Sequence, residues 1–396
     1  MYNTSWWLIV PLIFTAAGIQ SSQRDDEDAE LLVNFQPKLI VKYGYKVEDH
    51  TVITEDGYVL KVFQMPPRQR SCIKKKPVLL VHGLLSSSAD YVFGGPNSSL
   101  AYLLADNCYD VWLANMRGSR YSREHLRLPV QSKEYWDFSW HEMGQYDLPA
   151  IIDLVLNATN FNKLFYIGHS QGVTEYFVMA SVRPEYNNKI ALMTGLSPAV
   201  AQTRFRSPIL SFACNYAYTI KKTLDFYKIY EFLPQSKLYR LFCQTTALYD
   251  LCLQIYGLIF GPHPEETDRT LLLRYLANFP QGSSFNQLLH YAQVAASGGR
   301  FQWFDYGRKG NLEKYRSSEP PAYNLTASTA PVLIYYGLND WMVHPKDVQK
   351  FSTMLPNLIA AIPVADQNFN HMDFVLAKNV RKVLYDKMLL MLDKYN

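Results

Sequence analysis

Short apolar runs alternate with amphipathic stretches along the first half of the chain. The continuous apolar runs predict buried strands at residues 77–82, 110–114, 165–167 and 190–196. The stretches between them predict helices, including one over residues 100–106 and one that Asp147 caps. Two further strands are predicted earlier in the chain, at 45–50 and 58–64. The alternation predicts an α/β fold with a mostly parallel sheet and helices on both faces.

The alternation stops between residues 199 and 325, where aromatic side chains accumulate instead. A long stretch without strands, placed between two strands of the sheet, predicts a helical cap inserted into the core. The alternation resumes with a strand at 331–337 and ends with a helix over 380–392. We therefore predict a core formed by residues 21–198 and 326–396, with the cap, 199–325, between its two parts.

The N-terminal residues are typical of a secretory signal. An apolar run over residues 6–19 ends in small residues, and a polar, acidic stretch follows it. The run is too short to span a bilayer, and no later stretch resembles a transmembrane helix. We predict a signal peptide over residues 1–20 and passage through the secretory pathway. Three sequons agree with export and predict N-glycosylation at Asn97, Asn157 and Asn324.

Composition narrows the classes of function. The chain is 48% hydrophobic, and its net charge of +4 is modest for 396 residues. The one tight basic run, at 74–76, is too narrow for a nucleic-acid-binding face, so no nucleic acid partner is expected. No metal-binding or nucleotide-binding motif is present, so we expect no metal and no cofactor. The five cysteines are an odd number, and Cys108, beside a predicted strand, is expected to be a buried thiol.

The segment 164–173 has the pattern of a buried strand, a Gly-x-Ser-x-Gly turn and the start of a helix. This is the context of a nucleophile elbow, in which a serine on a sharp strand-to-helix turn exposes its hydroxyl. Gly168 and Gly172 fit such a turn because a side chain at either position would clash with the neighbouring strand or helix. Ser170 is therefore the predicted nucleophile, and an ordinary glycine-rich turn is the alternative.

An activated serine needs a base and an acid, which in α/β hydrolases follow it in the order acid, then histidine. His371 lies in a polar turn after an apolar segment, where the base is expected, whereas His290 falls within the cap and His344 opens a helix. Asp340 directly follows a buried strand, at the end where open α/β sheets gather their sites. The competing carboxylates are expected on the surface or too close to the histidine, and they are Asp347, Asp366 and Asp373.

The tetrahedral oxyanion of ester hydrolysis needs two backbone N–H donors. Gln171, which follows the nucleophile, is predicted to supply one of them. Leu84, in the loop after the strand 77–82, is predicted to supply the other. His82 and His169 lie beside these positions, and we interpret both as structural or pocket-lining residues and not as bases.

Several longer motifs resemble the acid lipase family, which comprises gastric lipases, lysosomal acid lipases and their insect relatives. The resemblance covers nearly the whole chain from Asn34 onward. The motifs that carry it lie at residues 42–45, 54–58, 81–85, 104–106, 109–113, 136–142, 166–172, 339–341 and 369–374. The resemblance implies an α/β-hydrolase fold with an inserted cap or lid.

The resemblance also implies roles for individual residues. It matches three residues to the family's triad, namely Ser170, Asp340 and His371. It matches Leu84 and Gln171 to the oxyanion donors, and Cys243 and Cys252 to a disulfide of the cap. It implies activity on triacylglycerol or cholesteryl esters in a gut lumen or a lysosome.

The leading hypothesis is a secreted or lysosomal serine lipase that hydrolyses neutral lipid esters at a lipid–water interface through an acyl-enzyme. The cap is either a lid that moves at that interface or an immobile cover whose aromatic residues are buried. Two other functions remain open for the same fold. One is a non-catalytic lipid carrier, and the other is an acyltransferase or a phospholipase, which would use the same triad.

Overall fold

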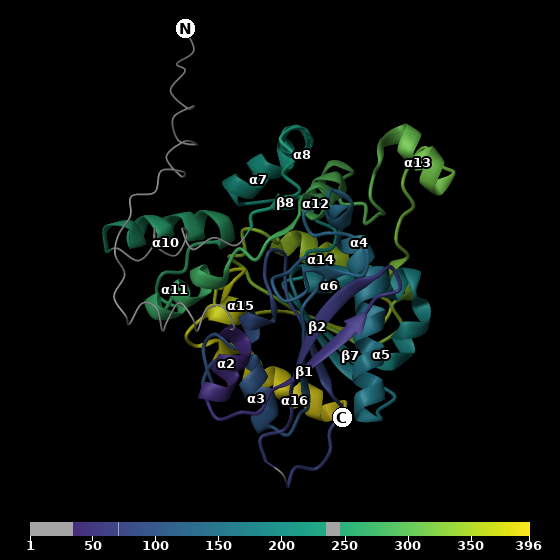
Figure 1. Cartoon of the computed structure of the whole chain (residues 1–396). Helices are drawn as coiled ribbons and strands as arrows, with labels where there is room; N and C mark the ends of the chain where they lie inside the picture. The colour runs from purple at the N-terminus through teal and green to yellow at the C-terminus, as the bar shows by residue number, and fades with distance from the viewer. Residues whose placement is uncertain (1–34, 70, 235–245) are drawn as a thin grey trace.

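A nine-stranded sheet runs through the centre of the computed structural model, which describes residues 35–69, 71–234 and 246–396 (Figure 1). The strands are β1 (Glu48–Ile53), β2 (Tyr58–Met65), β3 (Val78–Val81), β4 (Val111–Ala114), β5 (Glu124–His125), β6 (Leu164–His169), β7 (Ile190–Leu196), β10 (Val332–Tyr336) and β11 (Leu358–Pro363). Their order is β1-β2-β4-β3-β6-β7-β10-β11, with β5 paired to β2. Only β2 pairs antiparallel, with β1, β4 and β5, so the predicted mostly parallel sheet is confirmed.

Helices cover both faces of the sheet. Successive side chains of a strand point to opposite faces, so a strand with apolar residues at every position has to be covered on both. On one face, Val78 and Leu80 of β3 share a buried cluster with residues of α2 (Phe35–Lys42), α3 (Leu100–Asp106) and α16 (Asp386–Lys394). On the other face, Leu79 and Val81 share a cluster with residues of α5 (Leu148–Thr159), α6 (Gln171–Val182) and α14 (Pro345–Ser352). The predicted helix over 380–392 begins as a wider turn, η8 (Arg381–Tyr385), and continues as α16.

The strand predicted at 45–50 is displaced toward the C-terminus, since β1 begins at Glu48. The reason is that Tyr45 packs against α3, outside the sheet. Its buried ring lies edge-on to Tyr102 of α3, and its hydroxyl donates to Asp106 at 2.9 Å. The apolar character of Tyr45 therefore reflects contact with a helix and not the start of a strand.

The prediction that Asp147 caps a helix is wrong. The helical path is continuous from α4 (Trp140–Glu142) through a wide turn, η5 (Met143–Asp147), into α5, and the Asp147 side chain makes no capping bond. Its carboxylate instead forms a buried ion pair with Arg117 at 2.6 Å, and Arg117 also pairs with Asp56 at 2.6 Å. A full buried charge partner 30 residues away outweighs local capping at this position.

The chain between β7 and β10 adds helices and no strand of the large sheet within the described residues. It contains α7 (Pro208–Asn215), α8 (Ala217–Phe226), α10 (Thr246–Phe260), α11 (Arg269–Asn278), α12 (Phe285–Ala296) and α13 (Gly307–Tyr315). A small ladder joins β8 (Glu231–Phe232) to β9 (Ser283–Ser284). Figure 1 shows α7, α8, α12 and α13 above one end of the sheet. None of the helices in the described part of the chain has the length and apolar character needed to cross a bilayer.

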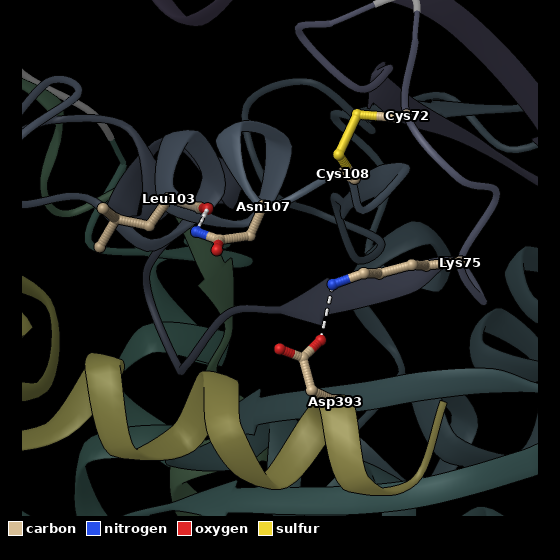
Figure 2. The surroundings of a disulfide bond; sticks show 6 residues. All are labelled: Cys72, Lys75, Leu103, Asn107, Cys108 and Asp393. Atoms are coloured by element: carbon tan, nitrogen blue, oxygen red, sulfur yellow. Dashed lines mark hydrogen bonds and ion pairs between the residues drawn. A yellow bond between two sulfur atoms is a disulfide. The ribbon is translucent and has the colours of Figure 1, made fainter.

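The predicted buried thiol at Cys108 is wrong, because Cys108 forms a disulfide with Cys72 (Figure 2). The two cysteines are 36 residues apart, and the loop between β2 and β3 returns Cys72 to the turn that follows α3. Cys214, on α7, is a free cysteine and is partly buried. Cys243 lies outside the described residues, so its pairing with Cys252 stays a prediction, as does the signal peptide over residues 1–20.

Candidate active site

Ser170 occupies a strained turn between β6 and α6. Its backbone has φ +53° and ψ −113°, a conformation that is rare for any residue other than glycine. The turn is possible because its flanking glycines leave room for backbone. A Cβ at Gly172 would lie 2.6 Å from the carbonyl oxygen of Val81, and one at Gly168 would lie 2.8 Å from the carbonyl carbon of Gly172. These contacts are those of a nucleophile elbow.

The structure brings the three predicted catalytic side chains into one chain of hydrogen bonds. The hydroxyl oxygen of Ser170 lies 2.9 Å from Nε2 of His371, and Nδ1 of His371 lies 2.8 Å from Oδ2 of Asp340. All three side chains are buried. The other oxygen of Asp340 accepts from the backbone N–H groups of Met342 at 2.9 Å and Val343 at 2.7 Å. The carboxylate is therefore held on both oxygens, which fixes the plane of the imidazole beside it.

Ser197 is a fourth member of this network, and the sequence analysis missed it. Its buried hydroxyl donates to Oδ2 of Asp340 and lies 3.0 Å from Nδ1 of His371. It directly follows β7, the strand between β6 and β10, which is why it reaches a site built by those two strands. Ser197 also has a left-handed backbone, with φ +50°. A polar residue at the end of the strand between nucleophile and acid is the signal that could have identified it.

The end of α10 ties the loops that carry the acid and the base to the cap. The carbonyl of Phe260 accepts from the backbone N–H of Trp341 at 3.2 Å and from that of His371 at 3.3 Å. The side-chain amide of Asn370 donates to the carbonyl of Gly261 at 2.7 Å. The position of the predicted base therefore depends on a segment that is distant in sequence from it.

His263, just after α10, extends this connection. Its Nδ1 lies 2.7 Å from Oδ2 of Asp373, which in turn accepts from the N–H of Asn370 at 2.7 Å. Although burial alone would lower its pKa, the hydrogen bond with Asp373 and the nearby Asp366 raise the pKa of His263 above its ordinary value. Burial raises the pKa of Asp373, and the hydrogen bond with His263 reduces this rise.

The competing acids and histidines are engaged elsewhere. The prediction that Asp347 lies on the surface is wrong. Asp347 is buried and accepts from the N–H groups of Thr203 at 2.7 Å and Arg204 at 2.9 Å. Its burial could not be predicted from the local sequence because its partners lie more than 140 residues away. His344 opens α14 as predicted, since its Nδ1 accepts from the N–H of Lys346. His290 stacks on Trp140 with ring centroids 3.5 Å apart.

The two predicted oxyanion donors lie in segments next to the serine. Gln171 is the first residue of α6, so its N–H has no partner within the helix. Leu84 follows Gly83, where a Cβ would come within 3.2 Å of the Ser170 Cβ, so this loop passes directly beside the nucleophile. Neither N–H makes a hydrogen bond to another described residue. The side-chain amide of Gln171 donates to Gln287 of α12 at 2.6 Å, which connects the elbow to the cap.

His82 and His169, interpreted from the sequence as structural or pocket-lining residues, both bond to backbone, and His169 also lines the cavity described below. His82 Nδ1 lies 2.8 Å from the carbonyl of Gly83 and its Nε2 accepts from the N–H of Met116 at 3.2 Å. His169 Nε2 lies 3.0 Å from the carbonyl of His371. Burial lowers the pKa of His82 to about 4 and that of His169 to about 3. Both rings are therefore neutral near pH 7, and neither contributes a cation beside the nucleophile.

Ser170 and His371 open into a cavity of about 870 Å³, which includes its mouth. The core supplies the side chains of Leu84, Leu85, Met342 and Met372 to its wall. The cap supplies Ile209, Leu210, Ala213, Phe232 and Leu288. This apolar lining is typical of sites that enclose an organic ligand. Asp90 is the acidic residue among the lining side chains.

Comparison with known proteins agrees with this geometry. A family profile described as the alpha/beta hydrolase fold matches residues 76–378, and one described as a partial alpha/beta-hydrolase lipase region matches residues 36–95. The chain therefore belongs to the α/β-hydrolase fold family. Two solved structures support the fold: a monoglyceride lipase from Saccharomyces cerevisiae (TM-score 0.50, 18% identity, 87% of this chain and 96% of that one) and a putative lipase from Acinetobacter baumannii (0.51, 14%, 96% and 100%).

Relatives with curated names are lipases. Lipase 1 of Drosophila melanogaster is 43% identical over 93% of this chain and 81% of its own length. Gastric triacylglycerol lipase of Bos taurus is 34% identical over 97% and 98%, and lysosomal acid lipase/cholesteryl ester hydrolase of Macaca fascicularis is 33% identical over 90% of each. Within its fold family the chain is thus an ester hydrolase of the lipase type, and the resemblance seen in the sequence is confirmed.

Proposed function

We propose that the chain is a secreted or lysosomal serine lipase that hydrolyses neutral lipid esters, with triacylglycerol and cholesteryl esters as its substrate class. The observation that carries the proposal is the Ser170–His371–Asp340 chain, with contacts of 2.9 and 2.8 Å, at the base of an apolar cavity. Relatives named as triacylglycerol lipase and cholesteryl ester hydrolase support the substrate class.

Acylation begins when Oγ of Ser170 attacks the ester carbonyl while Nε2 of His371 takes the hydroxyl proton. Asp340 stabilises the imidazolium that results, and Ser197 keeps the carboxylate oriented. The N–H groups of Leu84 and Gln171 bind the oxyanion of the tetrahedral intermediate. The intermediate collapses when the C–O bond to the alcohol breaks and His371 returns the proton to the leaving oxygen.

Deacylation repeats these steps with water as the nucleophile. His371 takes a proton from water, the resulting tetrahedral intermediate uses the same oxyanion donors, and the fatty acid leaves as Ser170 regains its proton. The elbow favours both half-reactions because the serine hydroxyl, the imidazole and the two N–H groups are in place before substrate binds.

The outer surface of the cap supports action at a lipid–water interface. Helices α7 and α8, with the residue that follows α8, expose large apolar side chains, among them Phe212 at 61%, Phe226 at 79% and Tyr227 at 67%. On α7 no residue is buried, and on α8 only Ala217 is. Exposed apolar residues in this number mark contact with a membrane or another apolar partner. Ile209 and Leu210 of α7 also line the cavity, so this surface adjoins the site.

Two features support the secretory pathway and N-glycosylation. The Cys72–Cys108 disulfide is of the kind that persists in oxidising compartments. The three predicted glycosylation residues, Asn97, Asn157 and Asn324, are all exposed, so an oligosaccharide can be attached at each without disturbing the core.

The test measures fatty-acid release from emulsified triolein and cholesteryl oleate by the wild type and by Ser170→Ala. We expect release by the wild type and a loss of at least about 10⁴-fold in the variant, because the nucleophile is gone while the oxyanion site remains. The thermal unfolding of the variant is the control for its fold. Retained turnover would contradict the role of Ser170, whereas the absence of release by the wild type from either ester would favour the lipid carrier.

A further inference from the structure

Asp90 places a carboxyl group in the mostly apolar wall of the cavity. It lies on a short turn, η3 (Ser88–Tyr91), and lines the same cavity as Ser170 and His371. Its side chain is buried, with 3% of the residue exposed. A carboxylate in such a place needs a cation or several donors to replace its lost hydration. The surroundings of Asp90 therefore decide in which protonation state it remains.

No cation compensates Asp90. It forms no ion pair with any described residue, and the Ser86 hydroxyl is the hydrogen-bonding side chain beside it. Strands β3 and β4, which pack against η3, contain no titratable residue, and Asp373 of α15 (Asp373–Leu376) binds His263 instead. The basic residues of the other neighbouring elements, α2, α11 and η8, are all exposed, and they are Lys38, Lys42, Arg269, Arg274, Arg381 and Lys382.

The remaining titratable neighbours are neutral or distant from any compensating role. Burial raises the pKa values of Tyr91, Tyr275 and Tyr385, so these phenols keep their protons. His169, on the cavity wall, is neutral for the reason given above. His371 reaches the cavity but is bound to Asp340 and Ser170. Because nothing offsets its burial, the pKa of Asp90 rises to about 7, and the Ser86 hydroxyl lowers it less than burial raises it.

We propose that Asp90 is a specificity-determining residue: a long acyl chain fills the cavity only when the Asp90 carboxyl group is protonated. The physical reason is that the chain displaces the water that would hydrate a carboxylate at the cavity wall, while a neutral carboxyl beside Ser86 tolerates an apolar neighbour. That the chain belongs to an ester substrate rests on the proposed function. The coupling between chain binding and the proton does not, because it requires only the cavity.

The proposal makes affinity for long chains depend on pH in a defined direction. Above neutrality Asp90 must take up a proton before a chain can bind, so the dissociation constant rises with pH. With a pKa of about 7 and binding only to the neutral form, the constant at pH 8.5 is about 30-fold higher than at pH 6.

The test measures binding without catalysis. The probe is 1-O-hexadecylglycerol, an uncharged ether that a lipase cannot hydrolyse, and its binding to the full-length wild type is followed by displacement of a neutral hydrophobic fluorophore from pH 6 to 8.5. Calorimetry in buffers of different ionisation enthalpy gives the protons taken up per bound molecule. We expect weakening by about 30-fold over this range and uptake approaching one proton at pH 8.5.

Asp90→Asn keeps the size of the side chain and removes its ionisation, so the proposal predicts a pH-independent dissociation constant and no proton uptake. Asp110→Asn is the matched control, because Asp110 is a partly buried carboxyl outside the cavity whose pKa burial also raises. This control should keep the full pH dependence of the wild type. In turnover assays, KM for oleoyl esters should rise with pH in the wild type, while KM for butyryl esters, which leave water beside Asp90, should rise far less.

A pH-independent dissociation constant in the wild type would overturn the proposal, and so would a pH dependence that Asp90→Asn retains. If Asp90→Asn does not fold, proton uptake by the wild type decides alone, and uptake near zero at pH 8.5 would overturn the proposal. Chain binding with the expected pH dependence but without ester hydrolysis would contradict the proposed function and leave the role of Asp90 supported.

Discussion

The two walls of the cavity use apolar residues in opposite ways. The core wall is made of the loops of Leu84, Ser170, Asp340 and His371, and the strands before the first three, β3, β6 and β10, are buried at every residue. The cap wall includes α7, and α8 packs beside α7 without lining the cavity; these two helices are also rich in aromatic and aliphatic residues but leave several of them exposed. The same composition thus serves packing in one wall and leaves a free apolar surface in the other.

This difference separates stability from substrate access. In the core wall a small change of shape alters both the fold and the chemistry, because its atoms are in contact on every side. In the cap wall a change of polarity leaves the packing nearly untouched and alters what the surface can bind. The experiments below either break this contrast or make it sharper.

The largest effect is expected for Gly172→Ala in the core wall. The new Cβ would lie 2.6 Å from the carbonyl oxygen of Val81, a backbone atom that can move only with β3. We expect a loss of about 1–3 kcal/mol in the free energy of unfolding and a fall in kcat of about 100-fold, because Ser170 is displaced. The measurements are urea unfolding and hydrolysis of a soluble butyrate ester. The control is Gly257→Ala in the cap helix α10, where the nearest atom would be 3.4 Å away, and equal losses in both variants would contradict the contrast.

The next effect is expected when the exposed surface of the cap beside its cavity wall is made polar. The double variant Phe226→Glu, Tyr227→Glu removes two of the most exposed aromatic side chains of the cap. We expect the ratio of activity on emulsified triolein to activity on soluble butyrate to fall about 10-fold or more, because burial of such a ring in lipid contributes roughly 1.5–3 kcal/mol. Leu390→Glu is the matched control, since Leu390 is 71% exposed on α16, at the opposite end of the molecule from α8 (Figure 1). An unchanged ratio in the double variant would show that this surface of the cap does not contact lipid.

A smaller effect is expected at Ser197, where two substitutions separate the hydroxyl from the backbone. Ser197→Ala and Ser197→Gly both remove the hydrogen bond to Asp340, but glycine also accepts the left-handed φ of +50° without strain. If the hydroxyl positions the carboxylate, both variants lose about 10- to 100-fold in kcat with KM little changed, since a hydrogen bond to a charged group contributes about 1.5–3 kcal/mol. Full activity in Ser197→Gly would show that only the backbone matters at this position.

The smallest effect is expected at His263, which joins the segment after α10 to Asp373. Its raised pKa means that its contribution to stability is complete below the ordinary histidine value, about pH 6.5, and is lost as the pH rises through the raised value. His263→Gln should therefore destabilise the protein by about 1 kcal/mol at pH 6 and by less at pH 8.5. Urea unfolding at the two pH values checks this. A larger difference at pH 8.5 than at pH 6 would contradict the sign of the shift.

Local patterns were enough to predict the sheet and to select the residues that meet at the site. The elbow is encoded within ten consecutive residues, and Asp340 and His371 each follow a recognisable strand. Features that depend on partners distant in sequence were not predictable in this way. Asp147 binds Arg117 across 30 residues, and the Cys72–Cys108 disulfide spans 36. In each case the short-range pattern pointed to a cap or a thiol because the true partner lies outside any local window.

Ser197 and Asp90 show a second limit of the sequence. Each is a small polar residue next to a strand or on a turn, and such residues are common in loops. Their importance comes from which strands and helices are adjacent in space. Ser197 reaches the triad because β7 lies between β6 and β10, and Asp90 lines the cavity together with Tyr275 of α11, which is distant from it in sequence.

The carbonyl groups of Phe260 and Gly261 have a consequence for engineering. Because they accept hydrogen bonds from the loops of both the acid and the base, the inserted helices and the triad form one cooperative unit. A chimera that imports the cap of a relative to change substrate preference must therefore keep residues 260–263 together with the loops they contact. A junction placed inside this segment would transfer the new surface but would lose the hydrogen bonds that position the His371 imidazole.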